Sequence, residues 1–329
     1  MGHGKKNFAF IGCGVVAHYH ADVILALGHK ILGVSSRPNS NKIDAFSKKY
    51  NIDFYYDDYQ KMLEELKPDA IIICTSWDQT EKIIGDVINS GIPALVEKPF
   101  ALSTEKITDL LEEMGQLSDN ILVGYNRRFY DFIPELKKTI ASHELLSSHL
   151  NFPEAVSYLL ESHSSKIQNH VLLYMSSHWI DLAMYLLGDI EISFMRKKYN
   201  NRGHVISYNG LLKSINGGVP IHYSSEFDSP QVISIRFVFS NSVWELSPIE
   251  ILTVYEVLER IEPTSNFPLR RYLPKIFKKY QTDLRYKPGF FKQMEYFIEA
   301  YLLGECAKDR GCTVKEALKL TQFCDQIQN

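Results

Sequence analysis

Several features are missing from this chain. It has no apolar run approaching the roughly 20 residues that span a bilayer, and its net charge of −3 leaves no basic stripe for a nucleic-acid backbone. No apolar export segment precedes the first predicted strand. We therefore expect a cytoplasmic protein whose partners include neither membrane nor nucleic acid.

Metal and nucleophile motifs are also missing. The five cysteines are odd in number and include no CxxC pair, and neither an HExxH nor a GxSxG motif occurs. His18 and His20 lie two apart on a predicted helix, where side chains face different directions. We expect reduced cysteines and no bound metal.

The chain contains a glycine turn between a predicted strand and a predicted helix. Residues 12–17 read Gly-Cys-Gly-Val-Val-Ala, directly after the apolar run 7–11 and before a segment, 21–27, with helical spacing of apolar residues. Such a turn lets the backbone approach a pyrophosphate, and the following helix offers it unpaired N–H groups. Gly12, Gly14, Val15 and Val16 are therefore candidate dinucleotide contacts.

Short apolar runs alternate with helix-length amphipathic segments in the first part of the chain. The predicted strands are residues 7–11, 31–35, 54–56, 70–74, 94–96 and 121–123. Continuous apolar strands are typical of a parallel sheet covered by helices on both faces. Ligands bind at the carboxyl ends of such strands, so residues 12, 35–37, 75–80, 97–99 and 124–128 are the positions of interest.

The pattern changes from about residue 145. Residues 231–239 alternate apolar and polar side chains, and Asn216-Gly217-Gly218 is a turn signal, which indicates a mostly antiparallel sheet. A helix is predicted over His178–Leu187, ended by Gly188. The tail is helical over 290–303 and 314–326, and the proline-containing segment 262–274 is predicted to be a surface loop.

The second predicted strand ends in Ser35-Ser36-Arg37 rather than in a carboxylate. Hydroxyls and a guanidinium suit the 2′-phosphate of NADP(H), and no nearby residue in the sequence repels it. NADP(H) is therefore favoured and NAD(H) is the other possibility. In the alternative interpretation Arg37 is a solvated turn residue.

Four motifs together point to a family. They are Glu97-Lys98-Pro99, residues 124–129 (Gly-Tyr-Asn-Arg-Arg-Phe), residues 177–182 (Ser-His-Trp-Ile-Asp-Leu) and residues 244–250. In this order behind the glycine turn they resemble the glucose–fructose oxidoreductase / inositol dehydrogenase / MocA (Gfo/Idh/MocA) family.

The resemblance implies an α/β fold. It consists of an N-terminal Rossmann domain with a doubly wound parallel sheet, over 1–124, and a C-terminal α+β domain with a large, open, mostly antiparallel sheet, over 125–329. The C-terminal helices are expected to pack back on the first domain. The resemblance also implies a homodimer or homotetramer.

The same resemblance implies pyridine-nucleotide redox chemistry on sugars or polyols, with Lys98 and His178 catalytic. Physical reasoning supports these roles: a proton must move at the reacting oxygen, which suits an imidazole, and a lysine stabilises the negative charge that develops there. The alternatives are a surface lysine at a strand end and a histidine at a helix start.

The chain departs from the family pattern at two places. Tyr174 occupies the position of the usual acid four residues before His178, and a phenol cannot supply a fixed negative charge at pH 7. Either Tyr174 is a third catalytic residue that helps to bind or protonate a sugar hydroxyl, or the site binds a ligand without turnover. Residues 75–80 replace a Pro-Asn-x-x-His pattern. Within them the cofactor-binding candidates are Thr75, Ser76, Trp77 and Thr80.

The remaining site residues follow from these motifs. Glu97, Lys98 and Asn126 are further cofactor-binding candidates. The predicted substrate-binding residues are Lys98, Tyr125, Asn126, Arg127, His170, Tyr174 and His178. Arg127 or Arg128 suits an anionic sugar or a diphosphate, unless these arginines serve only the domain interface. For the polar residues of the segment 152–170 two interpretations are open: they line a sugar pocket, or they form a solvated loop.

The expected function is that of an NAD(P)-dependent oxidoreductase, a sugar dehydrogenase or ketoreductase that transfers a hydride between nicotinamide and a sugar or nucleotide-linked sugar. The missing acid keeps a second hypothesis open, a non-catalytic NAD(P)-binding sensor of the same fold. A third is an enzyme of the family that uses tightly bound NAD(P) for glycoside cleavage or epimerisation.

Overall fold

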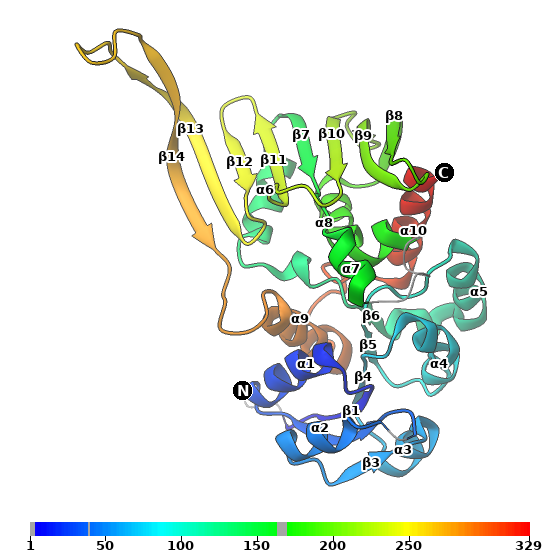
Figure 1. The fold of residues 1–329 in the computed structure, drawn as a ribbon. Coiled ribbons are helices and arrows are strands. Elements are labelled where there is room, and N and C mark those ends of the chain that lie inside the picture. Colours follow the sequence, from blue (N-terminus) through cyan, green and yellow to red (C-terminus); the bar gives the residue numbers. More distant parts are fainter. Residues whose placement is uncertain (1–3, 39, 163–169) are drawn as a thin grey trace. The chain divides into compact units, whose positions relative to one another are not determined.

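The first sheet of the protein is parallel and six-stranded. In a computed structural model, which describes residues 4–38, 40–162 and 170–329, its strand order is β3-β2-β1-β4-β5-β6 (Figure 1). The strands are β1 (Asn7–Ile11), β2 (Lys30–Ser35), β3 (Phe54–Tyr56), β4 (Ala70–Ile73), β5 (Ala94–Val96) and β6 (Ile121–Val123). The order reverses between β1 and β4, and this is the point at which such sheets bind ligands.

The apolar runs of the sequence form the buried strands of this sheet. All four residues of β4 are fully buried, as are Phe8, Ala9 and Phe10 of β1. The connecting helices are α1 (Val15–Ala26), α2 (Ile43–Tyr50), α3 (Tyr59–Leu66), α4 (Trp77–Asn89) and α5 (Thr104–Met114), followed by the 3-10 turns at Gly115–Asn120 and Asn126–Phe129. Local chemistry sets their ends: the Asp58 carboxylate accepts from two N–H groups at the start of α3.

The second sheet has eight strands in the order β14-β13-β12-β11-β7-β10-β9-β8. Its strands are β7 (Leu145–Asn151), β8 (Ile190–Tyr199), β9 (Val205–Ser214), β10 (Pro220–Glu226), β11 (Ser234–Phe239), β12 (Val243–Leu246), β13 (Ile251–Ile261) and β14 (Arg271–Gln281). Only β7 and β10 pair in parallel, and the other neighbours are antiparallel. The predicted fold class is thus confirmed for both sheets.

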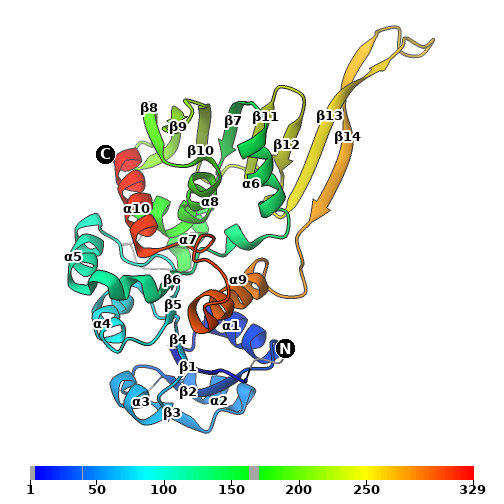
Figure 2. The ribbon, with the colours of Figure 1, turned by 180° about the vertical axis from the view of Figure 1, so that it is seen from behind.

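One face of the second sheet is covered by helices. Figure 2 shows α6 (Ile133–Ser142) and α8 (Ser177–Leu187) against it. Alternation along β11 explains the arrangement, because Ile235, Phe237 and Phe239 are buried while Arg236 is exposed. The short helix α7 (Val156–Ser162) follows β7, and a π-helical turn, Leu172–Ser176, leads into α8. Gly188, with φ of 79°, ends α8 as predicted.

The strands β13 and β14 form a long hairpin that extends past the rest of the sheet (Figure 1). The predicted surface loop over 262–274 is therefore too long, since β14 already begins at Arg271 and pairs Leu273 with Glu259 and Pro274 with Leu258. Proline is compatible with this position because β14 is an edge strand, where one side of the backbone needs no partner.

The chain divides into two compact units. The first contains Met1–Phe129 and Leu284–Gln322, and the second contains Tyr130–Asp283 and Phe323–Asn329. The C-terminal elements are α9 (Phe290–Phe297), a π-helix (Ile298–Leu303) and α10 (Val314–Gln328), whose last residues belong to the second unit. Within the described residues, no helix is both long enough and apolar enough to cross a membrane.

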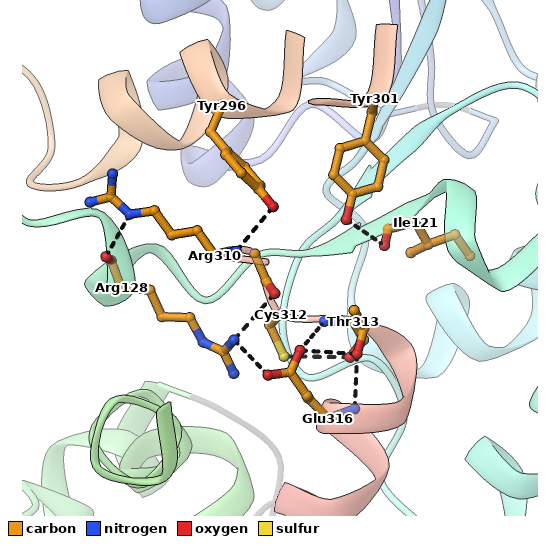
Figure 3. A network of polar contacts seen from close by, with 9 residues as sticks. Ile121, Arg128, Tyr296, Tyr301, Arg310, Cys312, Thr313 and Glu316 are labelled. Atoms are coloured by element: carbon orange, nitrogen blue, oxygen red, sulfur yellow. Dashed lines mark hydrogen bonds and ion pairs between the residues drawn. The ribbon is translucent and has the colours of Figure 1, made fainter. Parts of the chain in front are cut away.

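A buried arginine fastens the C-terminal segment of the first unit beside β6 (Figure 3). The Arg128 guanidinium, in a residue only 2% exposed, donates to the Gly311 carbonyl at 3.2 Å and to the Glu316 carboxylate at 2.9 Å. Glu316 also accepts from the Thr313 N–H and hydroxyl. The Val123 N–H donates to the Cys312 carbonyl at 2.9 Å, which adds a backbone link between the two segments.

We predict that Glu316 makes stability depend on acidic pH. Burial raises the pKa of Glu316, but the Arg128 charge and the Thr313 hydrogen bonds outweigh this and hold the pKa below its usual 4.5. A carboxylate with a lowered folded-state pKa stabilises the fold above the unfolded-state pKa, and this stabilisation is lost as the pH falls through the lower folded-state value. Urea unfolding between about pH 5 and pH 3 should therefore show a shallower loss of stability in Glu316→Gln than in wild type.

The same substitution should cost about 1–2 kcal/mol at pH 7, because a charged hydrogen bond to Arg128 is lost. Glu112→Gln, on the exposed side of α5, is the matched control and should keep the wild-type pH dependence. If the stability of Glu316→Gln fell between pH 5 and pH 3 as steeply as that of wild type, Glu316 would not be the source of the pH dependence.

Candidate functional site

The glycine turn is held between the neighbouring strands β2 and β4. The Gly12 N–H donates to the Ser35 carbonyl at 2.8 Å, and the Cys74 N–H donates to the Ile11 carbonyl at 2.8 Å. Gly12 has φ of +100°, and a Cβ there would lie 2.5 Å from the Cys74 carbonyl oxygen. Only glycine fits this position.

Gly14 differs from Gly12, because a Cβ at Gly14 would meet no atom of the described residues within 4 Å. Gly14 is the N-cap residue of α1 and has extended backbone. Because glycine has no side chain, it does not cap the first N–H groups of the helix. The described residues therefore leave the space beside the start of α1 unfilled. This is the arrangement in which helix N–H groups receive a phosphate.

A cavity of about 340 Å³ opens beside this turn. It brings together residues from the carboxyl ends of β1, β2 and β4, as the strand order requires. The candidate cofactor residues that line it are Gly12, Gly14, Ser35, Ser36, Arg37, Thr75 and Ser76.

The other cofactor candidates near the turn lie outside the cavity lining. Val15 is 67% exposed on the first turn of α1, and Val16 and Trp77 are half-buried. Thr80 is buried, and its hydroxyl lies 2.7 Å from the Thr75 hydroxyl. Thr80 thus orients Thr75, which itself lines the cavity.

The structure adds cavity residues that sequence reasoning missed, namely Ser40, Lys42, Asp57 and Tyr59, and it places Gln79 of the segment 75–80 in the same lining. Lys42 supplies a second cation beside Arg37. Asp57 supplies a carboxylate, so the expectation that nothing near Arg37 repels a 2′-phosphate is wrong. The signal was present in the sequence, because Asp57 directly follows the strand Phe54–Tyr56 and strand ends line the ligand crevice.

A second group of polar residues lies at the ends of β5 and β6. The Glu97 carboxylate lies 2.7 Å from His20 Nε2 and accepts from the Lys98 N–H at 3.3 Å. Neither Glu97 nor Lys98 lines the cavity beside the glycine turn. Asn126 is 1% exposed, and its side-chain amide donates to the Pro288 carbonyl at 2.7 Å, so this amide holds the segment before α9.

Lys287 joins this group from the C-terminal part of the first unit. Its ammonium lies 4.7 Å from the centre of the Tyr19 ring. Burial and the like charge of Arg127 lower the pKa of Lys287, while the Glu97 carboxylate opposes this. No sequence signal predicts that Lys287 lies here, because about 160 residues separate it from Arg127.

The neighbours of Arg127 in its motif are buried. Tyr125 is 1% exposed, and Arg128 is 2% exposed and bonded to Gly311 and Glu316 (Figure 3). Arg128 therefore serves the fold of the first unit. Of the two arginines considered for an anionic substrate group, Arg127 is the half-buried one.

In the second unit, Tyr174 and His178 lie on one continuous helical segment. Tyr174 is in the π-helical turn and His178 is in the first turn of α8, and both are half-buried. Burial raises the pKa of Tyr174 above its usual 10, so the phenol is a neutral hydrogen-bond donor at pH 7. His170 is half-buried just before this segment, whereas residues 163–169 of the predicted polar stretch lie outside the described residues.

A cavity of about 720 Å³ lies along the same segment. Met175 and Trp179, which flank Tyr174 and His178 in the sequence, form part of its wall. Its polar lining comes from Glu154, Asp228, Ser229, Gln231 and Glu250. Tyr174, His178 and His170 are themselves outside this lining, while Glu154 accepts a hydrogen bond from the Ser176 hydroxyl at 2.8 Å.

Known proteins share both the sequence pattern and the fold. Residues 6–125 match the oxidoreductase family GFO_IDH_MocA, described as an NAD-binding Rossmann fold. A myo-inositol 2-dehydrogenase from Thermotoga maritima is 21% identical over 186 residues, which are 54% of each chain. The match thus spans about half the length of this curated relative.

Solved structures match over nearly the whole chain. A dehydrogenase (MviM) from Clostridium difficile has a TM-score of 0.76 at 20% identity, covering 98% of this chain and 99% of that one. KijD10, a 3-ketoreductase from Actinomadura kijaniata in complex with NADP and TDP-benzene, has a TM-score of 0.72 at 15% identity, covering 98% and 97%. Residues 6–125 are thus a domain of the Gfo/Idh/MocA oxidoreductase family with an NAD-binding Rossmann fold, and the solved structures show that the fold is shared over the rest of the chain.

Proposed function

We propose that this protein is an NAD(P)-dependent oxidoreductase that acts on a hydroxyl or keto group of a sugar or nucleotide-linked sugar. The observation that carries the proposal is the cavity beside Gly12 and Gly14, where an uncapped helix start meets hydroxyl and guanidinium groups. These groups suit a dinucleotide. The cavity beside Trp179 has a mainly apolar wall that includes carboxylates and an amide, and these polar groups suit a ligand rich in hydroxyl groups.

We propose further that NADP(H) is the preferred cofactor. Arg37 and Lys42 give the cavity two cations, against the single carboxylate of Asp57. A guanidinium offers paired donors to a phosphate, and Ser35 and Ser36 add hydroxyls beside it. The balance of charge therefore favours a 2′-phosphate over a bare ribose hydroxyl.

Arg37→Ala should weaken NADPH binding about 10- to 100-fold and NADH binding less than about 3-fold, since only NADPH loses a charged hydrogen bond. Fluorescence titration of the reduced cofactors measures both constants. Asp57→Asn should shift the preference further towards NADPH. The control is Lys48→Ala, an exposed lysine of α2 that does not line the cavity. Equal losses for both cofactors in Arg37→Ala would refute this preference.

The proposed catalytic residues are Lys98, His178 and Tyr174. When bound, the nicotinamide supplies the redox partner for hydride transfer. In the oxidation of an alcohol, His178 takes the hydroxyl proton and the Lys98 ammonium stabilises the negative charge that develops on the oxygen. In the reduction of a ketone, His178 returns that proton. Tyr174, neutral at pH 7, donates a hydrogen bond to a substrate oxygen.

Lys98→Ala and His178→Ala should each lower kcat by about 10²- to 10⁴-fold, while the dissociation constant for NADPH changes little. Consumption of NADPH with a panel of keto-sugars, followed by absorbance, measures this. Tyr174→Phe should have a smaller effect, because it removes one hydrogen-bond donor. If both alanine variants kept full turnover, Lys98 and His178 would not be catalytic residues. NADPH binding without turnover on any sugar would instead favour a non-catalytic sensor.

We also propose a homodimer or homotetramer. Large apolar side chains on the β13–β14 hairpin are exposed, including Leu258 at 64%, Ile276 at 57% and Phe277 at 56%. Monomeric proteins rarely leave such a surface uncovered, and a hairpin exposed on both faces is marginally stable by itself.

The double variant Ile276→Lys/Phe277→Lys should reduce the particle mass measured by light scattering to that of one chain, about 38 kDa. The far-ultraviolet circular dichroism spectrum should stay unchanged. A wild-type protein with the mass of a single chain would contradict the proposal.

A further inference from the structure

A buried histidine of the glycine-turn helix contacts the residue next to Lys98. His20 lies on α1 and is fully buried, and its Nε2 is 2.7 Å from Glu97 Oε1. Glu97 directly follows β5 and is joined to Lys98 by one peptide bond. The contact therefore links the helix that starts at the glycine turn to the backbone of Lys98.

The Glu97 carboxylate is fixed from several sides. Its Oε2 accepts the Lys98 N–H at 3.3 Å. Gly124 lies so close that a Cβ there would be 3.0 Å from the Glu97 carboxyl carbon. The His20 ring is itself held by Phe290, with ring centres 4.6 Å apart. A carboxylate held this tightly restricts the backbone to which it is attached.

The proton of this contact can be assigned. His20 Nδ1 is buried with no hydrogen-bond partner among the described residues. A carboxylate oxygen can only accept, so Nε2 carries the proton and His20 donates to Glu97 Oε1. The Glu97 carboxylate also acts on Lys287 in the same cluster.

We propose that His20 is a positioning residue, which fixes the Lys98 backbone through Glu97 and so sets the place of the lysine relative to the glycine turn. This inference rests on the proposed role of Lys98 in catalysis. It adds a residue that contacts neither cavity. The expected effect is on rate rather than on binding, because a misplacement of about 1 Å can cost roughly 10²-fold in turnover.

Four variants test the proposal. His20→Ala should lower kcat about 10- to 100-fold, with the NADPH dissociation constant within about 3-fold of wild type. His20→Gln places an amide N–H near the position of Nε2 and should recover most of the rate. Gly124→Ala pushes on the Glu97 carboxylate from the other side, so it should lower kcat as well, and it should add little to His20→Ala.

His18→Ala is the matched control. His18 lies on the same helix and bonds the Tyr50 hydroxyl at 3.0 Å, away from Glu97, so its loss should leave kcat unchanged. A merely structural role for His20 predicts a lower melting temperature with no difference between His20→Ala and His20→Gln in kcat. Parallel losses of kcat and NADPH affinity in His20→Ala, or no rescue by His20→Gln, would overturn the proposal.

A readout without turnover separates this proposal from the proposed function. Hydrogen–deuterium exchange of the peptide containing residues 97–101 reports the Lys98 N–H, which Glu97 protects. Exchange should speed up at least about 10-fold in His20→Ala and return towards wild type in His20→Gln. Unchanged exchange refutes the positioning role even if Lys98 proves catalytic. Faster exchange together with a fully active Lys98→Ala variant refutes the proposed function and keeps the positioning role.

Discussion

The close approach of Gly12 to the Cys74 carbonyl is the constraint on which the candidate site depends. There is no room for a side chain at Gly12, so β1 can turn into α1 directly against the end of β4. That turn leaves the first N–H groups of α1 open beside Gly14, and it brings the ends of β1, β2 and β4 around one cavity. The cofactor site is therefore a consequence of strand order and one missing Cβ.

Charge around this edge of the sheet is arranged in two groups. Arg37, Lys42 and Asp57 line the cavity beside the glycine turn. Glu97, Arg127 and Lys287 influence one another at the ends of β5 and β6, where His20 holds the carboxylate. The first group suits recognition of a phosphate, and the second sets the surroundings of Lys98. The helix α1 takes part in both, since its start faces the cavity and its middle holds Glu97.

The sequence predicts the fold well where the spacing of apolar residues follows one clear pattern. The apolar run 70–74 predicted a buried strand, which β4 forms over 70–73, and the alternation over 231–239 placed Ile235 and Phe237 inward as observed. The sequence also predicts residues at or just past the ends of strands, such as Ser35 and Thr75. Contacts between distant segments were not predictable. Neither periodicity nor a motif predicts that Arg128 bonds Glu316, or that Lys287 lies near Glu97, because these contacts depend on how the segment 284–322 packs within the first unit.

The departures from expectation have a common physical cause. Asp57 was missed although the strand 54–56 was predicted, because its place at the same sheet edge as Ser35 depends on the pairing of β3 with β2. The loop predicted over 262–274 contains a strand because an edge position tolerates Pro274. In both cases the outcome depended on how strands pair in the sheet, which the sequence of the segment does not show.

The most direct measurement of the central claim is NADPH binding to the wild-type protein and to Gly12→Ala, by isothermal titration calorimetry. The account predicts one cofactor bound per wild-type chain and no detectable binding in Gly12→Ala, because a Cβ at this position displaces the turn from β4. Binding of NADPH to Gly12→Ala as tightly as to the wild type would contradict it.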